Sequence, residues 1–269
     1  VIQINDTHPT LVIPELMRIL LDVEGYSWND AWNIVTHTVA YTNHTVLAEA
    51  LERWPQGLIE NLLPRIWQIL KEIAARYQRT LEQHFHGDQS KVSKMAIIWN
   101  GEVRMANLCV CACYAVNGVS ALHSEILKQD VFHDAYTMRP EQFKNVTNGV
   151  DHRRWLSQIN PKLDALVKEC TGGDDYLLHP EAIRGLEKYK DDQSVLSQLE
   201  AIKKENKRRF AAYVARESGV VLNTDAVFDV QVKRLHEYKR QLLNVLHIIH
   251  LYNQLRDNPN MEFTPQTFL

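Results

Sequence analysis

The first 85 residues alternate short apolar runs with polar turns and then settle into helical spacing. Val1 to Ile4 forms a β-rich run that ends in the polar turn Asn5-Asp6-Thr7-His8-Pro9, which is typical of the carboxyl end of a buried strand. A second polar stretch, residues 41–45, interrupts the pattern further on. Apolar residues at helical spacings predict helices over about 10–23, 28–40 and 58–85.

The character of the chain changes around residue 150. An apolar segment with a break expected at Asn117-Gly118 is followed by a loop-like passage from Pro140 to Asp151. Arg153-Arg154-Trp155 then opens a new helical region. We therefore predict a domain boundary at this point, with one domain ending at residue 152 and another occupying 153–269.

The C-terminal part contains the clearest strand pattern. Residues 195–217 have the spacing of a charged amphipathic helix with a solvated face. From Val227 to Val232 apolar and polar side chains alternate with period two, which predicts a strand. A basic turn, a helix with one apolar stripe and a further strand start at 263–269 follow. This order predicts an α/β fold, rich in helices, with parallel strands.

Composition and charge narrow the classes of function. The 269 residues are 45% hydrophobic, and the formal net charge is -3 with both signs interspersed. This balance argues against a global attraction to nucleic acid or anionic membranes, so any anion site must be local. The longest apolar run, Leu108 to Val116, is too short to span a bilayer, and the N-terminus lacks a signal-peptide layout. We expect no membrane partner and a cytoplasmic location.

Three of the four cysteines alternate along the chain. Cys109, Cys111 and Cys113 would share one face if the segment were a strand. No CxxC pair or suitably spaced histidine suggests zinc, so we predict no metal site. Buried free thiols of a reducing compartment are the expected state.

The basic turn that follows the strand at Val227 is the first candidate for chemistry. In open α/β sheets, ligands gather beyond the carboxyl ends of strands, where the next helix offers free N–H groups to anions. Lys233, Arg234 and Lys239 occupy such a position and would hold phosphate groups. The spacing alone also fits a basic helix start that simply faces solvent.

Polar clusters near the N-terminus are the second candidate. Polar side chains on loops that converge on one pocket suit sugar hydroxyls, and Asn5, Asp6 and His8 form one such group. A second group contains His44 and Glu49, together with Asn43. Asp6 and Glu49 also fit the carboxylate pair of a glycosidase, or ordinary solvated and capping groups.

Seven strings resemble the signatures of the α-glucan (glycogen, starch or maltodextrin) phosphorylases, in that family's order and spacing. They are Asn5-Asp6-Thr7-His8-Pro9, Tyr41-Thr42-Asn43-His44-Thr45, Glu49-Ala50-Leu51-Glu52-Arg53-Trp54-Pro55, Ala115-Val116-Asn117-Gly118-Val119, His123-Ser124-Glu125, Thr147-Asn148-Gly149, and Lys233 to Asn244. The resemblance implies a two-Rossmann-domain glycosyltransferase (GT-B type). Such an enzyme cleaves terminal α-1,4-linked glucose from a glucan with inorganic phosphate and releases glucose 1-phosphate.

The resemblance also implies a role for individual residues. Carried over position by position, it assigns the sugar contacts to His44, Asn148, Val119 and Tyr238, and the acceptor side to Asp6 and His8. His44, Arg234 and Lys239 would form the catalytic group, with Arg234 and Lys239 on the substrate phosphate. The expected cofactor is pyridoxal 5′-phosphate, held by Lys233, Lys239 and Trp155 with His236 in support.

In that family the 5′-phosphate of the cofactor exchanges a proton with the substrate phosphate, and the glucosyl group is transferred with retention. Cations are needed there because two phosphates repel each other. The resemblance places residues 1–152 at the end of the N-terminal domain and 153–269 at the start of the C-terminal, cofactor-binding domain. It also implies that the parent enzyme is a homodimer.

Departures from the family pattern limit what the resemblance implies. Tyr114 replaces a common histidine, and Asp151-His152 replaces the usual Thr-Pro. The lysine that anchors the cofactor would lie beyond residue 269, so an internal fragment that is inactive alone is expected. A glucan- or anion-binding module without catalysis, and a nucleotide-sugar glycosyltransferase on the same scaffold, remain as alternatives.

Overall fold

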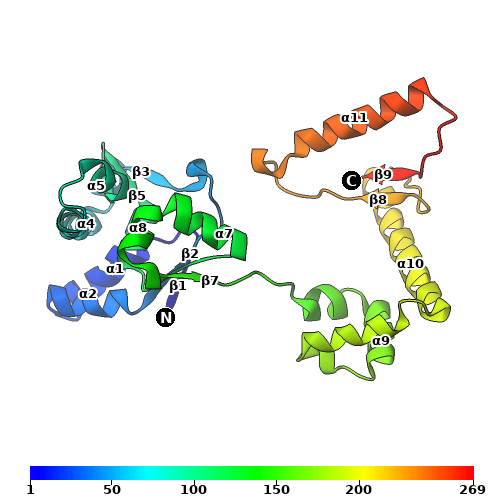
Figure 1. The fold of residues 1–269 in the computed structure, drawn as a ribbon, viewed down its shortest axis with the longest axis horizontal. Coiled ribbons are helices and arrows are strands. Elements are labelled where there is room, and N and C mark those ends of the chain that lie inside the picture. Colours follow the sequence, from blue (N-terminus) through cyan, green and yellow to red (C-terminus); the bar gives the residue numbers. More distant parts are fainter. The chain divides into compact units, whose positions relative to one another are not determined.

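A computed structural model describes the backbone of residues 1–269 and every side chain except that of Ala50. The chain divides into two compact units, Val1–Gly149 and Val150–Leu269 (Figure 1). Parallel strands occur in both units, and helices dominate, which confirms the α/β class expected from the sequence.

A four-stranded parallel sheet forms the centre of the first unit. Its strands lie in the order β1-β2-β6-β7. The bounds are β1 Ile2–Asn5, β2 Val39–Thr42, β6 Ala115–Gly118 and β7 Phe143–Asn145. Asn5 pairs with Thr42, Thr42 pairs with Asn117, and Gly118 pairs with Asn145. All four strands therefore end at one edge of the sheet, which is where ligands of such sheets bind.

Helices pack against this sheet; α6 packs beside β2, and α7 packs beside β6 and β7. The helices are α1 Val12–Arg18, η1 Ile19–Val23, α2 Trp28–Thr36, α6 Met105–Ala112, α7 Ala121–Ile126, η3 Leu127–Val131, α8 His133–Met138 and η4 Pro140–Gln142. Ser27 caps α2 and Ser120 caps α7 by accepting a backbone N–H, as residues at helix starts commonly do. The core includes Ile4, Tyr41 and Val116, all fully buried.

A second, antiparallel sheet of the same unit has the order β3-β5-β4. Its strands are β3 Arg53–Pro55, β4 Ile98–Trp99 and β5 Glu102–Arg104, and its helices are η2 Ala48–Ala50, α3 Gln56–Leu62, α4 Pro64–His84 and α5 Gln89–Met95. The long helix α4 begins with Pro64 in its first turn, where the missing N–H costs nothing. Leu70, Ile73 and Leu81 lie on its buried face.

The second unit begins with a small helical cluster. Its elements are η5 Arg153–Gln158, α9 Pro161–Thr171, η6 Asp175–Leu177 and η7 Pro180–Tyr189. The helix α9 ends at Gly172, whose φ of 84° suits a residue without a Cβ. Leu166, Val167 and Tyr176 form the buried centre, and the Tyr176 hydroxyl donates a hydrogen bond to Asp164.

The rest of the second unit has few buried side chains. The helix α10 (Gln193–Ser218) leads to the parallel pair β8 (Val227–Asp229) and β9 (Gln266–Phe268), with η8 (Glu237–Lys239) and α11 (Gln241–Asp257) between them. No residue of α10 or α11 is buried among the residues described. The apolar stripe of α11 faces solvent, with exposed fractions from 49% to 73% at Leu242, Val245, Leu246, Ile249 and Tyr252.

Several expectations from the sequence need correction. The cysteine run is not a strand, because Cys109 and Cys111 lie in α6 and the helix ends just before Cys113. The helix expected over 28–40 ends at Thr36, since Val39 and Ala40 belong to β2. The break at Asn117-Gly118 is the end of β6, and the loop expected over 140–151 contains β7.

Other expectations are confirmed. Helices occur over most of 10–23 and 58–85, and α10 covers the charged segment 195–217. The strand expected at 227–232 forms as the shorter β8, and β9 lies within 263–269. All four cysteines are free and buried, as predicted.

Candidate functional site

The turn after β1 places Asp6 and His8 at the carboxyl edge of the first sheet. Asp6 adopts the left-handed region, with φ of 61°, and its side chain accepts the N–H of Thr7 at 3.1 Å. The Thr7 hydroxyl donates to Glu52 at 2.6 Å, and His8 Nδ1 lies 3.1 Å from the same carboxylate. Aspartate tolerates this backbone region better than most residues, and functional turns often use it. Glu52 thus holds this turn in place.

The turn after β2 places His44 beside the turn after β1. His44 is exposed, and its Nε2 donates a hydrogen bond to Oδ1 of Asn5. Asn43, the residue before it, is fully buried and donates to the hydroxyl of Tyr41 at 3.0 Å. Burial raises the pKa of Tyr41 far above its usual range, so this hydroxyl stays protonated. The imidazole of His44 is therefore presented to solvent from a rigid support.

The turns after β6 and β7 bring Val119 and Asn148 together. The N–H of Asn148 donates to the carbonyl of Val119 at 2.9 Å. Gly118 is needed here because the backbone of Ser124 lies close to it. A Cβ added at Gly118 would lie 2.6 Å from Oγ and 2.9 Å from Cα of Ser124. Val119 is half-buried and Asn148 is exposed. Both side chains stand at the same sheet edge as His44.

His123, on α7, joins these turns. Its Nδ1 accepts the N–H of Val119 at 3.1 Å, and its Nε2 lies 3.0 Å from Oδ1 of Asn43. Burial, and next the neighbouring His44, lower the pKa of His123, so its ring is held neutral. His123, Glu52 and Tyr41 were assigned no role from the sequence, although all three lie inside the quoted strings.

The second unit carries the basic turn, between β8 and α11. Lys239 Nζ donates to the carbonyl of Arg234 at 2.9 Å, and Gln231 donates to the carbonyl of Lys239 at 3.0 Å. The rings of His236 and Tyr238 lie 4.3 Å apart between centroids, and Tyr238 is 60% exposed. These contacts shape the turn through hydrogen bonds from side chains to backbone, without a buried core.

The cations of this turn are available to an anion. Lys233, Arg234 and Lys239 form no ion pair with any side chain that the structure describes. Lys239 also lines an open hollow of about 420 Å³ at the end of β8, beside Arg240 and Asn244. The first turn of α11 borders it, and no side chain caps that helix start. Free N–H groups of a helix start attract anions.

Trp155 lies in η5, at the start of the second unit. Its indole is 56% exposed, and the guanidinium of Arg154 lies 5.0 Å from the centre of the ring.

Asp151 and His152, which depart from the family pattern, have local structural roles. Asp151 accepts the N–H of Arg154 at 3.1 Å, and His152 Nε2 lies 3.2 Å from the carbonyl of Leu177. The Asp-His sequence therefore secures the beginning of η5.

The residues of this unit fit pyridoxal phosphate by their chemistry. Three cations without carboxylate partners suit a phosphate group, and an exposed indole suits a flat pyridine ring. A metal site is a different matter. Among the described residues, no group of three or more His, Cys, Asp or Glu side chains is arranged to hold a metal ion.

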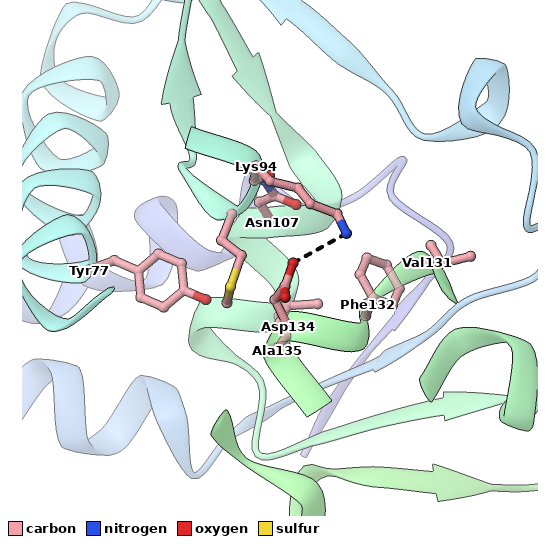
Figure 2. A pocket seen from close by; sticks show the side chains of 9 residues that line it. Tyr77, Lys94, Asn107, Val131, Phe132, Asp134 and Ala135 are labelled. Carbon is pink, nitrogen blue, oxygen red and sulfur yellow. Dashed lines mark hydrogen bonds and ion pairs between the residues drawn. The ribbon is translucent and has the colours of Figure 1, made fainter. Parts of the chain in front are cut away.

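A separate cavity in the helical layer of the first unit has a structural character. Figure 2 shows Tyr77, Lys94 and Asp134 around it, and Lys94 Nζ lies 3.2 Å from Oδ2 of Asp134. Its volume of about 30 Å³ has room for about two water molecules. Its lining residues come from α4, α5, α6, η3 and α8, and none of them is in the turns that carry the candidate site.

The first unit thus carries a polar sheet edge, and the second carries a basic turn beside an uncapped helix start. The family model for carbohydrate phosphorylases matches residues 1–269, and the chain belongs to this family. None of the described helices has both the length and the apolar character that a membrane span needs.

Relatives with curated names support the same family. The chain is 48% identical over 268 residues to a glycogen phosphorylase of Bacillus subtilis, covering all of this chain and 34% of that protein. It is 48% identical to the muscle form of glycogen phosphorylase of Bos taurus and 49% to that of Mus musculus, covering 32% of each. The chain spans about a third of the length of the curated relatives it matches.

Proposed function

We propose that the whole protein is an α-glucan phosphorylase. It transfers the terminal α-1,4-linked glucosyl group of a glucan to inorganic phosphate and releases glucose 1-phosphate. The observation that carries this proposal is the family match over the entire chain, with relatives named glycogen phosphorylase. The polar edge of the first sheet and the unpaired cations after β8 supply the two kinds of binding group that the reaction needs.

The sugar-binding part of the proposal uses the sheet edge. His44 and Asn148 bind the terminal glucose near its 6-hydroxyl, while Val119 lines the pocket and Tyr238 contacts the sugar. Asp6 and His8 lie toward the acceptor side of the glucan. The support for this part is geometric, because hydrogen bonds join the turns that carry His44, Val119 and Asn148. A pre-formed pocket fixes the reacting carbon without ordering costs at the moment of reaction.

The phosphate-binding part of the proposal uses the basic turn. Arg234 and Lys239 bind the substrate phosphate, and Lys233 pairs with the phosphate of the cofactor. Two unit charges 4 Å apart repel by about 4 kcal/mol at an effective dielectric constant of about 20. Fixed cations remove most of that barrier. Lys233 and Arg234 are exposed and Lys239 is half-buried, and the absence of a carboxylate partner at all three among the described side chains supports this role.

Pyridoxal 5′-phosphate is the proposed cofactor. When bound, it supplies a phosphate group that exchanges a proton with the substrate phosphate. Trp155 packs near its ring, Lys239 contributes to its binding, and His236 supports the basic turn. His44, Arg234 and Lys239 form the proposed catalytic group.

The wider assignments follow from the same proposal. Residues 1–152 are the end of the N-terminal domain, and 153–269 are the beginning of the cofactor-binding domain. The partners are an α-1,4-glucan and inorganic phosphate, and the enzyme is a cytoplasmic homodimer that binds neither nucleic acid nor membrane.

The test is a product assay on the whole protein with maltoheptaose. We expect glucose 1-phosphate to form only when inorganic phosphate is present. Glucan shortening that is independent of phosphate would instead indicate a hydrolase that uses carboxylates such as Asp6 and Glu49. Release of a nucleoside diphosphate from a uridine or adenosine diphosphate sugar would indicate a nucleotide-sugar transferase. Glucan binding without any product would indicate a binding module.

A further inference from the structure

His123 holds two turns of the first unit at once. One of its ring nitrogens contacts Val119, in the turn after β6, and the other contacts Asn43, in the turn after β2. Val119 in turn accepts the N–H of Asn148 through its carbonyl, and Asn43 precedes His44 in the chain. A single imidazole therefore connects the segments that carry all three proposed glucose contacts of this unit.

The hydrogen bonds fix the orientation of the Asn43 amide. Oδ1 of Asn43 accepts the backbone N–H of Thr45 at 3.0 Å, and a backbone N–H is only a donor. The other amide atom, Nδ2, donates to the hydroxyl of Tyr41. The atom that faces His123 is therefore an acceptor, and His123 Nε2 must donate to it.

The same logic fixes the tautomer of His123. The N–H of Val119 points at Nδ1, so this nitrogen must carry a lone pair. The ring is thus neutral, with its proton on Nε2. No rotation of the ring reproduces both contacts, because the two nitrogens have opposite roles. Ser120 also accepts the N–H of His123 at 3.1 Å, which secures the residue at the start of α7.

We propose that His123 is a positioning residue for glucose recognition. It sets the separation of the turn bearing His44 from the turn bearing Val119 and Asn148, without touching the sugar itself. This inference rests on the proposed function and deepens it, because it names the group that keeps the two walls of the sugar pocket in register.

The chain offers matched variants that separate the two contacts. In His123→Asn, the amide oxygen takes the place of Nδ1, so the contact with Val119 is kept and that with Asn43 is lost. In His123→Gln, the amide nitrogen takes the place of Nε2, so the contact with Asn43 is kept and that with Val119 is lost. His123→Ala loses both. His37→Gln is the control, because His37 is exposed and its ring contacts only the carbonyl of Asn33.

The experiment is steady-state phosphorolysis of maltoheptaose by the whole protein, with separate titration of glucan and phosphate. For His123→Ala we expect kcat/KM for the glucan to fall by about 100-fold, as for a displacement of about 1 Å in an active site. KM for phosphate should change by less than about twofold, since the basic turn is untouched. Each amide variant should recover part of the loss, and His37→Gln should match the wild type.

The outcomes separate a positioning role from a structural one. A purely structural role would lower kcat in proportion to the folded fraction and leave both KM values unchanged, and that result would overturn the proposal. Wild-type values for His123→Ala would overturn it as well. A wild-type protein that forms no glucose 1-phosphate at all would count against the proposed function itself, whereas an active wild type with unaffected His123 variants would count against the positioning role alone. If His123→Ala shows no cooperative unfolding and is therefore not folded, the two amide variants provide the test. Glucan KM values in both variants that equal the wild-type value would refute the role.

Discussion

The two units of the chain present their candidate residues in different ways. In the first unit, His44, Val119 and Asn148 sit at the edge of a four-stranded sheet with a closed core of fully buried side chains. In the second, Arg234 and Lys239 follow a two-stranded sheet, next to a helix without a buried residue among those described. The proposed sugar-binding edge is thus positioned by the packing of the first unit, and the proposed phosphate-binding turn by its own hydrogen bonds.

This difference matches the ligands proposed for each side. A sugar ring is recognised by hydroxyl groups at fixed separations, so its pocket needs walls that do not move. A phosphate is a compact anion that attracts cations over several ångströms, and a lysine on a flexible stem adapts to it. Packing should therefore matter most for the first unit and charge for the second.

The largest effect is expected from a core substitution in the first unit. Leu70→Ala removes a fully buried side chain from α4 and should lower the free energy of unfolding by about 2–5 kcal/mol. Leu246→Ala on α11, which is 54% exposed, should change it by less than about 0.5 kcal/mol. Denaturant unfolding of the 269-residue chain measures both. Similar losses for the two variants would erase the contrast between the units.

Charge is tested in the second unit with Arg234→Ala in the whole protein. Loss of one charged pairing is worth about 2–3 kcal/mol, so kcat/KM for phosphate should fall by about 30- to 150-fold, with glucan binding almost unchanged. Arg256→Ala is the control, because Arg256 lies on α11 and pairs only with Asp257. Equal losses for phosphate and for glucan would contradict the assigned role of Arg234.

A smaller stability effect is expected at the turn after β6. Gly118→Ala forces a Cβ against the backbone of Ser124 and should cost about 1–3 kcal/mol of unfolding free energy. Gly149→Ala has open space around the new Cβ and should cost much less. Thermal unfolding of the two variants provides the comparison. If Gly118→Ala were as stable as the wild type, this edge of the sheet would not be rigid.

The smallest effect is a pH dependence from His123. Its pKa is lowered in the folded state by burial and by His44, so the neutral ring stabilises the fold above the ordinary histidine pKa of about 6.5. As pH falls below that value, the unfolded chain takes up the proton first and this stabilisation is lost. The stability difference between the wild type and His123→Gln should therefore shrink from about pH 7.5 to about pH 5.5. If the stability difference between the two proteins instead grew as the pH fell, the assignment of His123 as a ring held neutral in the folded state would be contradicted.

The sequence predicted local structure well where apolar spacing was long and regular, as in α4 and α10. It failed where short strands lie next to helices, because Val39 and Ala40 continue a helical pattern and only pairing with β1 and β6 makes this segment a strand. The cysteine run gave no clear signal for a helix, although Cys109 and Cys111 lie in α6. Burial on every side of α6 removes the amphipathic pattern by which a helix is recognised.

The candidate site was only partly accessible from the sequence. The strings around His44 and Arg234 stood out, whereas the contacts of Glu52 with the turn after β1 depend on residues 45 positions apart. The link from His123 to Asn43 spans 80 positions. No local pattern encodes such pairs, since folding alone brings them together. The only signal in the sequence was that these residues are polar and lie within the seven strings that resemble the family signatures.

The most direct test of the central claim is a crystal structure of the whole protein with bound glucose 1-phosphate. We expect the glucose ring to contact His44 and Asn148 while the phosphate lies within hydrogen-bonding distance of Arg234 and Lys239. A phosphate bound away from these two cations, with Arg234 directed into solvent, would contradict it.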